Sequence, residues 1–271
     1  MVIDFHTHTI NYDFFQPWFL DRIKETAGNF DNLRAEFSQA NDFSRFLSEC
    51  GIDFAVVMAD HSEEVTGLCS NETVHSFCQD TDKLIPFCNI NPLKEKDPVW
   101  KLRECVEKGF KGLKLYPTYQ FFNMNDPVLY PLYELAQEIG MPVSYHTGIS
   151  VFKGSRVKYG EPIHIDDVAV DFPDLKIIMA HSGRGTWYEQ AALMAKLHKN
   201  VYMEISGLPA RKLLTYFPDL ERLQDKVVYG SDWPEITNIK KSIDTIKGLP
   251  ISEEAKEKIL GGNAKRLLGI D

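Results

Sequence analysis

The sequence predicts a single-domain (β/α)₈ barrel, the TIM barrel of the α/β class, over residues 1–271. The chain has 271 residues, close to the roughly 250 that are typical of this fold. Eight short β-type runs recur along the chain, and the segments between them carry helical apolar spacing. Such alternation indicates parallel strands joined by crossover helices. The competing open, doubly wound sheet usually has a G-x-G-x-x-G motif after its first strand, and this sequence has none there.

The predicted strands are short apolar runs that end in polar or turn residues. In chain order they cover 2–6, 53–58, 84–90, 111–116, 142–146, 175–181, 200–205 and 226–232. Two intervening segments, 98–108 and 128–139, have the apolar spacing of amphipathic helices. Gly109 and Gly140 follow them, at positions where glycine commonly ends a helix.

Two connections are long, 9–41 after the first strand and 147–163 after the fifth. The first is too aromatic for a solvated linker, with Tyr12, Phe14, Phe15, Trp18, Phe19, Phe30 and Phe37. We expect this excursion to pack over the mouth of the barrel, or else to form a satellite hydrophobic cluster or the contact surface of a homodimer.

Charge and composition narrow the choice of partner. The chain has 30 basic and 39 acidic residues, a net charge of −9, which repels a polyanion. We therefore expect a small-molecule substrate and no nucleic acid. The five cysteines form no C-x-x-C pair and indicate reduced thiols. We expect a soluble, cytoplasmic protein without membrane contact, since no apolar run reaches about 18 residues and the N-terminus does not resemble a signal peptide.

Titratable residues stand where several predicted strands end, which is where barrel enzymes place their active sites. They are His6, His8, His146, His181 and Asp232. Strand alternation places His6 and His8 on one face. A lone inward histidine is commonly a hydrogen-bonded core residue, but several such groups in one dry cavity destabilise each other unless a cation gathers them. Histidines with one carboxylate suit Zn²⁺, with Mn²⁺ or Fe²⁺ as alternatives.

Six segments in chain order resemble the metal-dependent amidohydrolase superfamily, specifically its amidohydrolase-related branch (amidohydrolase 2). They are DFHTH (4–8), GFKGLKLYP (109–117), MPVSYHTG (141–148), IIMAHSG (177–183), VVYGSDWP (227–234) and GGNAKRLLG (261–269). The branch contains small-acid hydrolases, lactonases and nonoxidative decarboxylases. H-x-H alone is a weak signal, whereas six segments at the expected strand positions are a strong one.

The resemblance implies a role for each residue. His6, His8 and His146 would bind one zinc ion, and Asp232 would be a ligand or near-ligand that takes a proton from the water bound to the metal. His181 would be a further ligand in a two-metal site, or the acid/base that polarises the substrate in a one-metal site. We favour one metal, because two-metal sites of this superfamily usually have a bridging glutamate or carboxylated lysine on strand four, and that strand offers only a lysine.

That lysine, Lys114, should share the barrel interior with Gly112 and Tyr116. It could pair with Asp4, bind a substrate carboxylate, or, if carboxylated, bridge two metals; we rank the last option lowest. Arg184 is suited to gripping a carboxylate, although a surface ion pair would explain it equally well.

Trp187 follows Arg184 in the sixth loop, and Tyr116 would help to shape the pocket. Packing roles are the simpler expectation for the other residues on the top-face loops, which are Tyr119, Phe152 and His164. Glu204, at the end of the seventh strand, is a candidate partner for a ligand.

Together these features predict a metal-dependent hydrolase that uses a metal-activated water on an amide, ester or lactone bond of a small molecule. Lys114 and Arg184 hint that this molecule is acidic. The main alternative is nonoxidative decarboxylation at the same site, with Asp232 or His181 protonating carbon. A TatD-like nuclease is less favoured, because it usually carries a glutamate at the end of strand four and acts on a polyanion. A non-catalytic barrel would be expected to lack a ligand, and none is missing.

Overall fold

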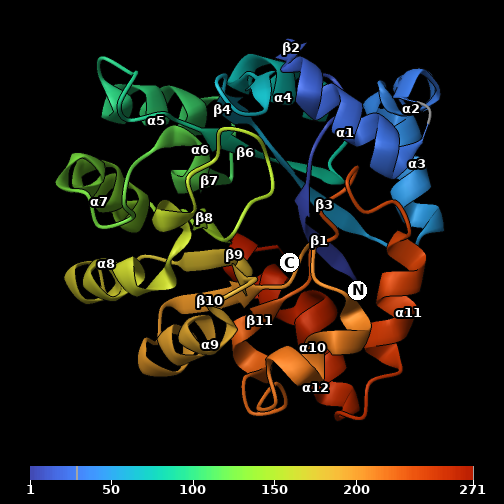
Figure 1. Ribbon diagram of the computed structural model, residues 1–271, viewed down its shortest axis with the longest axis vertical. Coiled ribbons are helices and arrows are strands. Elements are labelled where there is room, and N and C mark those ends of the chain that lie inside the picture. The colour runs from blue at the N-terminus through green and yellow to red at the C-terminus, as the bar shows by residue number, and fades with distance from the viewer. Residues whose placement is uncertain (29, 271) are drawn as a thin grey trace.

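The protein is a barrel of parallel strands surrounded by helices, as the sequence predicts (Figure 1). The computed structural model describes residues 1–28 and 30–270. The sheet order is β1-β3-β6-β7-β8-β9-β10-β11, and the adjacent strands pair in parallel. The strands are β1 (Ile3–Thr7), β3 (Phe54–Met58), β6 (Leu84–Asn89), β7 (Gly112–Leu115), β8 (Val143–Gly148), β9 (Ile177–Arg184), β10 (Val201–Glu204) and β11 (Val227–Val228).

The barrel is closed by contacts between β1 and the chain that follows β11. Phe5 N donates to Tyr229 O at 2.9 Å and His8 N donates to Trp233 O at 2.9 Å. A parallel bridge joins Thr7 to Trp233. His6 and Asp232 are therefore brought to the same part of the rim.

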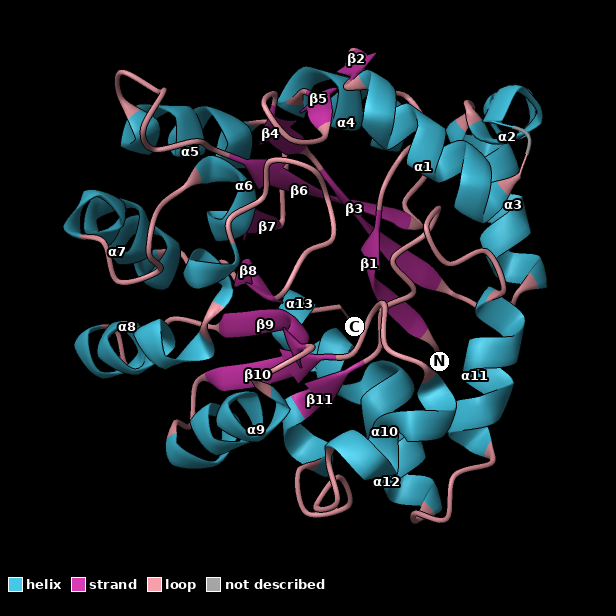
Figure 2. Cartoon of the chain, viewed as in Figure 1, coloured by secondary structure: helices cyan, strands magenta, loops and turns pink. Residues whose placement is uncertain are grey.

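Helices cover the outside of the barrel (Figure 2). They are α1 (Pro17–Ala27), α2 (Phe30–Phe37), α3 (Ala40–Glu49), α4 (Asn71–Cys78), α5 (Pro98–Glu107), α6 (Pro117–Gln120), α7 (Tyr130–Glu138), α8 (Ile165–Asp171), α9 (Tyr188–Leu197), α10 (Leu213–Tyr216), α11 (Ile239–Lys247), α12 (Glu253–Glu257) and α13 (Asn263–Leu268). Short 3₁₀ turns are η1 (Pro127–Leu129), η2 (Val157–Gly160), η3 (Pro162–His164), η4 (Ala210–Lys212) and η5 (Gln224–Lys226), and η6 (Lys258–Gly262) is a π-helical turn. In the part of the chain described here, no helix has the length and apolar character needed to cross a membrane.

Two hydrophobic layers support the site. An outer layer lies between strands and helices, and an inner cluster fills the barrel with side chains from β1, β3, β6, β9 and β11 and from α13. Space in the inner cluster is tight, because a Cβ atom on Gly112 would lie 2.2 Å from the Phe87 ring. This packing gives the polar groups above it a rigid floor.

If His6 and His8 face the barrel interior, strict alternation along the strand predicts that Phe5 faces the helices, and this prediction is wrong. Phe5 belongs to the inner cluster and packs edge-on against Phe87, with ring centroids 5.5 Å apart, instead of facing the helices. The register between β1 and β3 shifts between Asp4 and Thr7. Such an irregularity re-aims side chains, which lets His6 reach the site even though Phe5 also points inward.

The last strand is shorter than the predicted 226–232, because β11 ends at Val228. Beyond it the N–H of Ser231 donates to Asp4 Oδ1 at 2.8 Å instead of continuing a strand ladder. Asp232 thus lies in a loop. The predicted helix 128–139 is divided into η1 and α7, and Pro131 occupies the first turn of α7, where its missing N–H is not needed.

The excursion 9–41 contains β2 (Phe14–Phe15), α1, α2 and the first residues of α3. β2 joins a small antiparallel sheet with β5 (Gly67–Cys69) and β4 (Asp60–Ser62). Gly67 allows this pairing, because a Cβ there would lie 2.3 Å from Phe14 O. Tyr12, Phe15 and Phe19 line the cavity at the barrel mouth, so the expectation that the excursion packs over the mouth is confirmed.

Candidate metal centre

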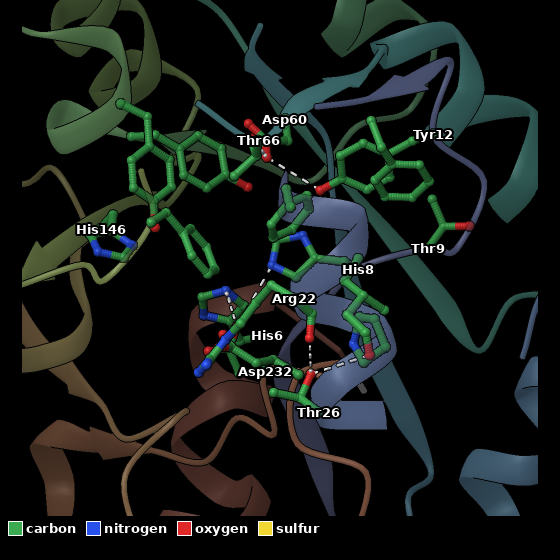
Figure 3. Close-up of a pocket in the computed structure, with 18 of the residues that line it drawn as sticks. His6, His8, Thr9, Tyr12, Arg22, Thr26, Asp60, Thr66, His146 and Asp232 are labelled. Carbon is green, nitrogen blue, oxygen red and sulfur yellow. Dashed lines mark hydrogen bonds and ion pairs between the residues drawn. The ribbon is translucent and has the colours of Figure 1, made fainter. Parts of the chain in front are cut away.

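A cavity opens at the carboxyl ends of the barrel strands and encloses about 640 Å³ of empty space, counted to its open mouth. Figure 3 shows His6, His8, His146 and Asp232 around it, with Arg22 reaching in from α1. The full lining is His6, His8, Thr9, Ile10, Tyr12, Phe15, Phe19, Arg22, Ile23, Thr26, Asp60, Thr66, Tyr116, Tyr119, His146, Phe152, His181, Arg184, Asp232, Pro234 and Glu235. All five titratable residues predicted at strand ends therefore meet at one place.

Asp232 is at the centre of this group. Its Oδ1 lies 3.5 Å from His6 Nε2 and 3.7 Å from His8 Nε2, and its Oδ2 lies 3.9 Å from His181 Nδ1. One donor atom from each of His6, His181 and Asp232 falls within 4.8 Å of the others, and all three residues are buried. His146 contacts the group through His181, with ring centroids 4.6 Å apart.

Two of these residues have unusual backbones. His181 has φ of 64° and Asp232 has φ of 68°, both in the left-handed region that non-glycine residues rarely adopt. Such conformations cost of order 1 to 3 kcal/mol and are commonly retained at functional sites. The His181 side chain thereby enters the cavity from within β9, and that of Asp232 enters it from the loop after β11.

The donors fit a divalent metal ion. Ligand atoms about 2.1 Å from zinc in a tetrahedron lie about 3.4 Å from one another, close to the 3.5 Å and 3.7 Å from Asp232 Oδ1 to the two imidazoles. His146 is only 2% exposed, and its Nε2 finds no hydrogen-bond partner within residues 1–28 and 30–270. A buried nitrogen without a partner is costly, and a metal bond would satisfy it.

The protonation of the site follows from burial. Burial first, and then nearby positive charge, holds the pKa values of His6, His146 and His181 well below the ordinary value. The three imidazoles are therefore neutral, as ligation requires. Burial alone would raise the pKa of Asp232. Attraction to His181 and His6 at a pH low enough to charge them, a hydrogen bond with His8 and the positive charge of Arg184 outweigh burial and hold that pKa well below its ordinary value.

Lys114 is fully buried, and its Nζ makes no hydrogen bond to any residue that the structure describes. Of the three options for Lys114, the pair with Asp4 was wrong, because Asp4 Oδ1 instead accepts the backbone N–H groups of His6 and Ser231. Burial lowers the pKa of Lys114 to about 8, although Glu204 and Asp232 oppose this effect. Lys114 is not among the cavity-lining residues, so substrate binding by it stays a prediction.

The other predicted substrate contacts lie in different places. Arg184 and Tyr116 line the cavity, whereas Trp187 is half-buried at the start of α9 and does not. Tyr119 and Phe152, for which we expected packing roles, also line it. His164 ends η3, outside the lining.

Several contributors were not foreseen from the sequence. Arg22 of α1 and Glu235 both line the cavity and form an ion pair, with Nη2 and Oε1 3.4 Å apart. Ser206 lies between His6 and His181, with its Oγ 3.0 Å from Nδ1 of each. The sequence contains no signal for either residue, because Arg22 is one of several charged residues in the excursion and Ser206 is an ordinary serine after β10.

Comparison with known proteins identifies the family. The family model described as Amidohydrolase, the amidohydrolase-2 branch, matches residues 3–270. The chain belongs to this family. It is 25% identical over 209 residues to 2-amino-3-carboxymuconate-6-semialdehyde decarboxylase of Dictyostelium discoideum, covering 64% of this chain and 57% of that relative. It is 29% identical over 235 residues to gamma-resorcylate decarboxylase of a Polaromonas strain, covering 68% of this chain and 71% of that relative.

Solved structures that are similar to this chain have the same barrel fold. An uncharacterized TIM-barrel protein from Bordetella bronchiseptica has a TM-score of 0.83 at 24% identity and covers 99% of this chain and 98% of its own. 5-carboxyvanillate decarboxylase from Sphingomonas paucimobilis has a TM-score of 0.70 at 15% identity, and the match covers 100% of this chain and 99% of that chain. At these identities the likeness establishes the barrel alone.

Proposed function

We propose that the protein is a metal-dependent, nonoxidative decarboxylase of a small carboxylic acid. The observation that carries the proposal is that both curated relatives are decarboxylases and that this chain has the buried histidine and aspartate cluster at the barrel mouth. The hydrolase that we expected from the sequence has less support, because neither relative is a hydrolase. We expect a small-molecule substrate and one divalent metal, with zinc as the first choice.

His6, His8, His146 and Asp232 are the residues that would hold the metal. When bound, the ion would supply positive charge that polarises an oxygen of the substrate. The chain's own contribution begins with Arg184, whose Nη1 lies 3.7 Å from Asp232 Oδ2, beyond hydrogen-bond distance. Arg184 lines the cavity, and a guanidinium has five N–H donors, so this ion pair leaves donors for a substrate carboxylate.

The cavity walls favour a flat, conjugated acid. Tyr12, Phe15 and Phe19 contribute rings from the excursion, and Tyr119 and Phe152 contribute rings from the opposite loops. Tyr119 and Phe152 contact each other with ring centroids 5.8 Å apart, and Phe152 contacts Phe19 at 5.0 Å. Such walls exclude water and stack on a planar substrate.

Decarboxylation breaks the bond between the carboxylate carbon and the ring or chain carbon and releases CO₂. The electron pair left on carbon must then take up a proton. This proton comes from solvent water, and the hydroxide that remains combines with the released CO₂ as bicarbonate. Asp232 and His181 are the two groups of the site assigned to relay the proton from water to carbon, because both are buried in the cavity lining within 3.9 Å of each other.

The test is a product assay with 2,6-dihydroxybenzoate, related hydroxybenzoates, and a panel of esters and lactones. We expect metal-loaded protein to release CO₂ from an acid and, in D₂O, to place one deuterium on the product carbon. His146→Ala should abolish turnover. The matched control is His198→Ala, since His198 pairs with Asp166 at 2.7 Å and is not part of the cavity lining.

Hydrolysis of an ester or lactone, with ¹⁸O from water in the product and no CO₂ release from any acid, would overturn the proposal. Equal turnover by His146→Ala and wild type would remove His146 from the site.

A further inference from the structure

The last residue of β10 and the turn after it, residues 204–207, contact both His6 and His181. Glu204 Oε2 lies 2.9 Å from His6 Nδ1 and accepts the Ser206 hydroxyl at 2.8 Å. The backbone N–H of Ser206 donates to Glu204 Oε1. The Ser206 hydroxyl lies 3.0 Å from Nδ1 of both His6 and His181, and the Ser206 carbonyl lies 3.1 Å from His181 Nδ1.

These partners determine which ring nitrogen carries the proton. Burial raises the pKa of Glu204 to about 7, so at pH 8 its side chain is a carboxylate. A carboxylate and a backbone carbonyl only accept hydrogen bonds, so Nδ1 of His6 and Nδ1 of His181 must then donate. The other nitrogen of each neutral ring, Nε2, is then free of a proton. In His6 this nitrogen is the one that faces Asp232 Oδ1 at 3.5 Å.

The turn has no room to rearrange. Glu204 and Ser206 are fully buried. A Cβ on Gly230 would lie 2.3 Å from Glu204 Oε1, and a Cβ on Gly207 would lie 2.5 Å from Arg184 Nη1. Close packing on both sides keeps the carboxylate and the hydroxyl against the two rings.

We propose that Glu204 and Ser206 are positioning residues that hold His6 and His181 in one tautomer, with Nδ1 protonated and Nε2 free. The Ser206 hydroxyl contacts both His6, which we assign to the metal, and His181, which we assign to proton transfer. The roles given to the two histidines rest on the proposed function, whereas the tautomers themselves do not depend on any activity.

The decisive variant is Glu204→Gln. Glutamine has a single acceptor oxygen, which the N–H of Ser206 would retain, so its NH₂ group would face His6 Nδ1. His6 would then have to accept there and carry its proton on Nε2. A metal would have to displace that proton, so we expect affinity for Zn²⁺ to fall by about 10- to 100-fold.

Two measurements on protein without substrate test the proposal. Long-range ¹H–¹⁵N NMR of histidine-labelled, metal-free protein at pH 8 should give protonated Nδ1 for His6 and His181 in the wild type, and protonated Nε2 for His6 in Glu204→Gln. Chelator competition with Zn²⁺ should give the predicted loss of affinity. Glu221→Gln is the matched control, because Glu221 likewise accepts the backbone N–H and the hydroxyl of a serine, Ser252, but is not part of the cavity lining.

Wild-type rings protonated on Nε2 would overturn the proposal, and this measurement does not require the variant to fold. An unchanged affinity in Glu204→Gln, or an equal loss in Glu221→Gln, would also overturn it. If the predicted tautomers appear but no acid is decarboxylated, the proposed function fails and the positioning role stands.

Discussion

Gly230→Ala should disturb the site through a single methyl group. Gly230 precedes Ser231 and Asp232, and a Cβ added there would lie 2.3 Å from Glu204 Oε1 and 2.8 Å from His6 Cβ. Both separations are shorter than any normal van der Waals contact, and both neighbours are buried. The carboxylate and the His6 backbone must therefore move apart.

The expected cost is that of overpacking, about 1 to 3 kcal/mol. For a domain of this size, 1 kcal/mol lowers Tm by about 2 to 4 °C, so the loss should be about 2 to 12 °C. Because the clash separates Glu204 from His6, the affinity for Zn²⁺ should fall as well. Differential scanning calorimetry of metal-free protein and chelator competition measure the two effects independently.

Gly248→Ala is the matched control, since the nearest atoms to its added Cβ, Asp244 O and Thr245 O, would lie at an ordinary 3.5 Å. Its Tm and metal affinity should match those of the wild type. Wild-type stability and metal affinity in Gly230→Ala, or an equal loss of stability in both alanine variants, would refute this prediction.

Three further predictions concern other parts of the molecule. Partial burial would raise the pKa of Asp13, but hydrogen bonds from the Ser70 N–H and the Thr73 hydroxyl outweigh it and lower that pKa below 3.8. Asp13→Ala should therefore lower the free energy of unfolding by about 1 kcal/mol in urea at pH 7. This difference should shrink as the pH falls below 3.8 toward the lowered pKa that Asp13 has in the folded protein. A difference that does not change with pH would contradict this prediction. Removing the metal with a chelator should lower the free energy of unfolding by about 2.7 kcal/mol relative to protein in a metal concentration of 100 times the Kd. Identical melting curves with and without metal would mean that no ion binds the native state selectively. Arg22→Gln should raise KM for an acidic substrate several-fold with little change in kcat, because Arg22 lines the cavity but is not among the clustered donors; a loss confined to kcat would contradict this.

The sequence predicted the parts of the fold that depend on local pattern. All eight barrel strands are present, because short apolar runs bounded by turn residues are decided by nearby residues. The gathering of His6, His146 and His181 was also predictable, because the ends of parallel strands meet at one rim in a barrel.

Features that depend on contacts between distant segments were not predictable. The side-chain direction at Phe5 depends on a register shift against β3, and the early end of β11 depends on the Asp4 carboxylate taking the N–H of Ser231. Asp4, one of the partners considered for Lys114, instead accepts the backbone N–H groups of His6 and Ser231. Ser206 is recognisable only once β1, β9 and β10 are side by side.

The most direct test of the account is an anomalous diffraction map from crystals of zinc-loaded protein, combined with elemental analysis of the same sample. We predict one ion per chain, bonded to His6 Nε2, His8, His146 and Asp232, with His181 near it but not bonded. Two ions with Lys114 between them, or no ion among these side chains, would contradict the account.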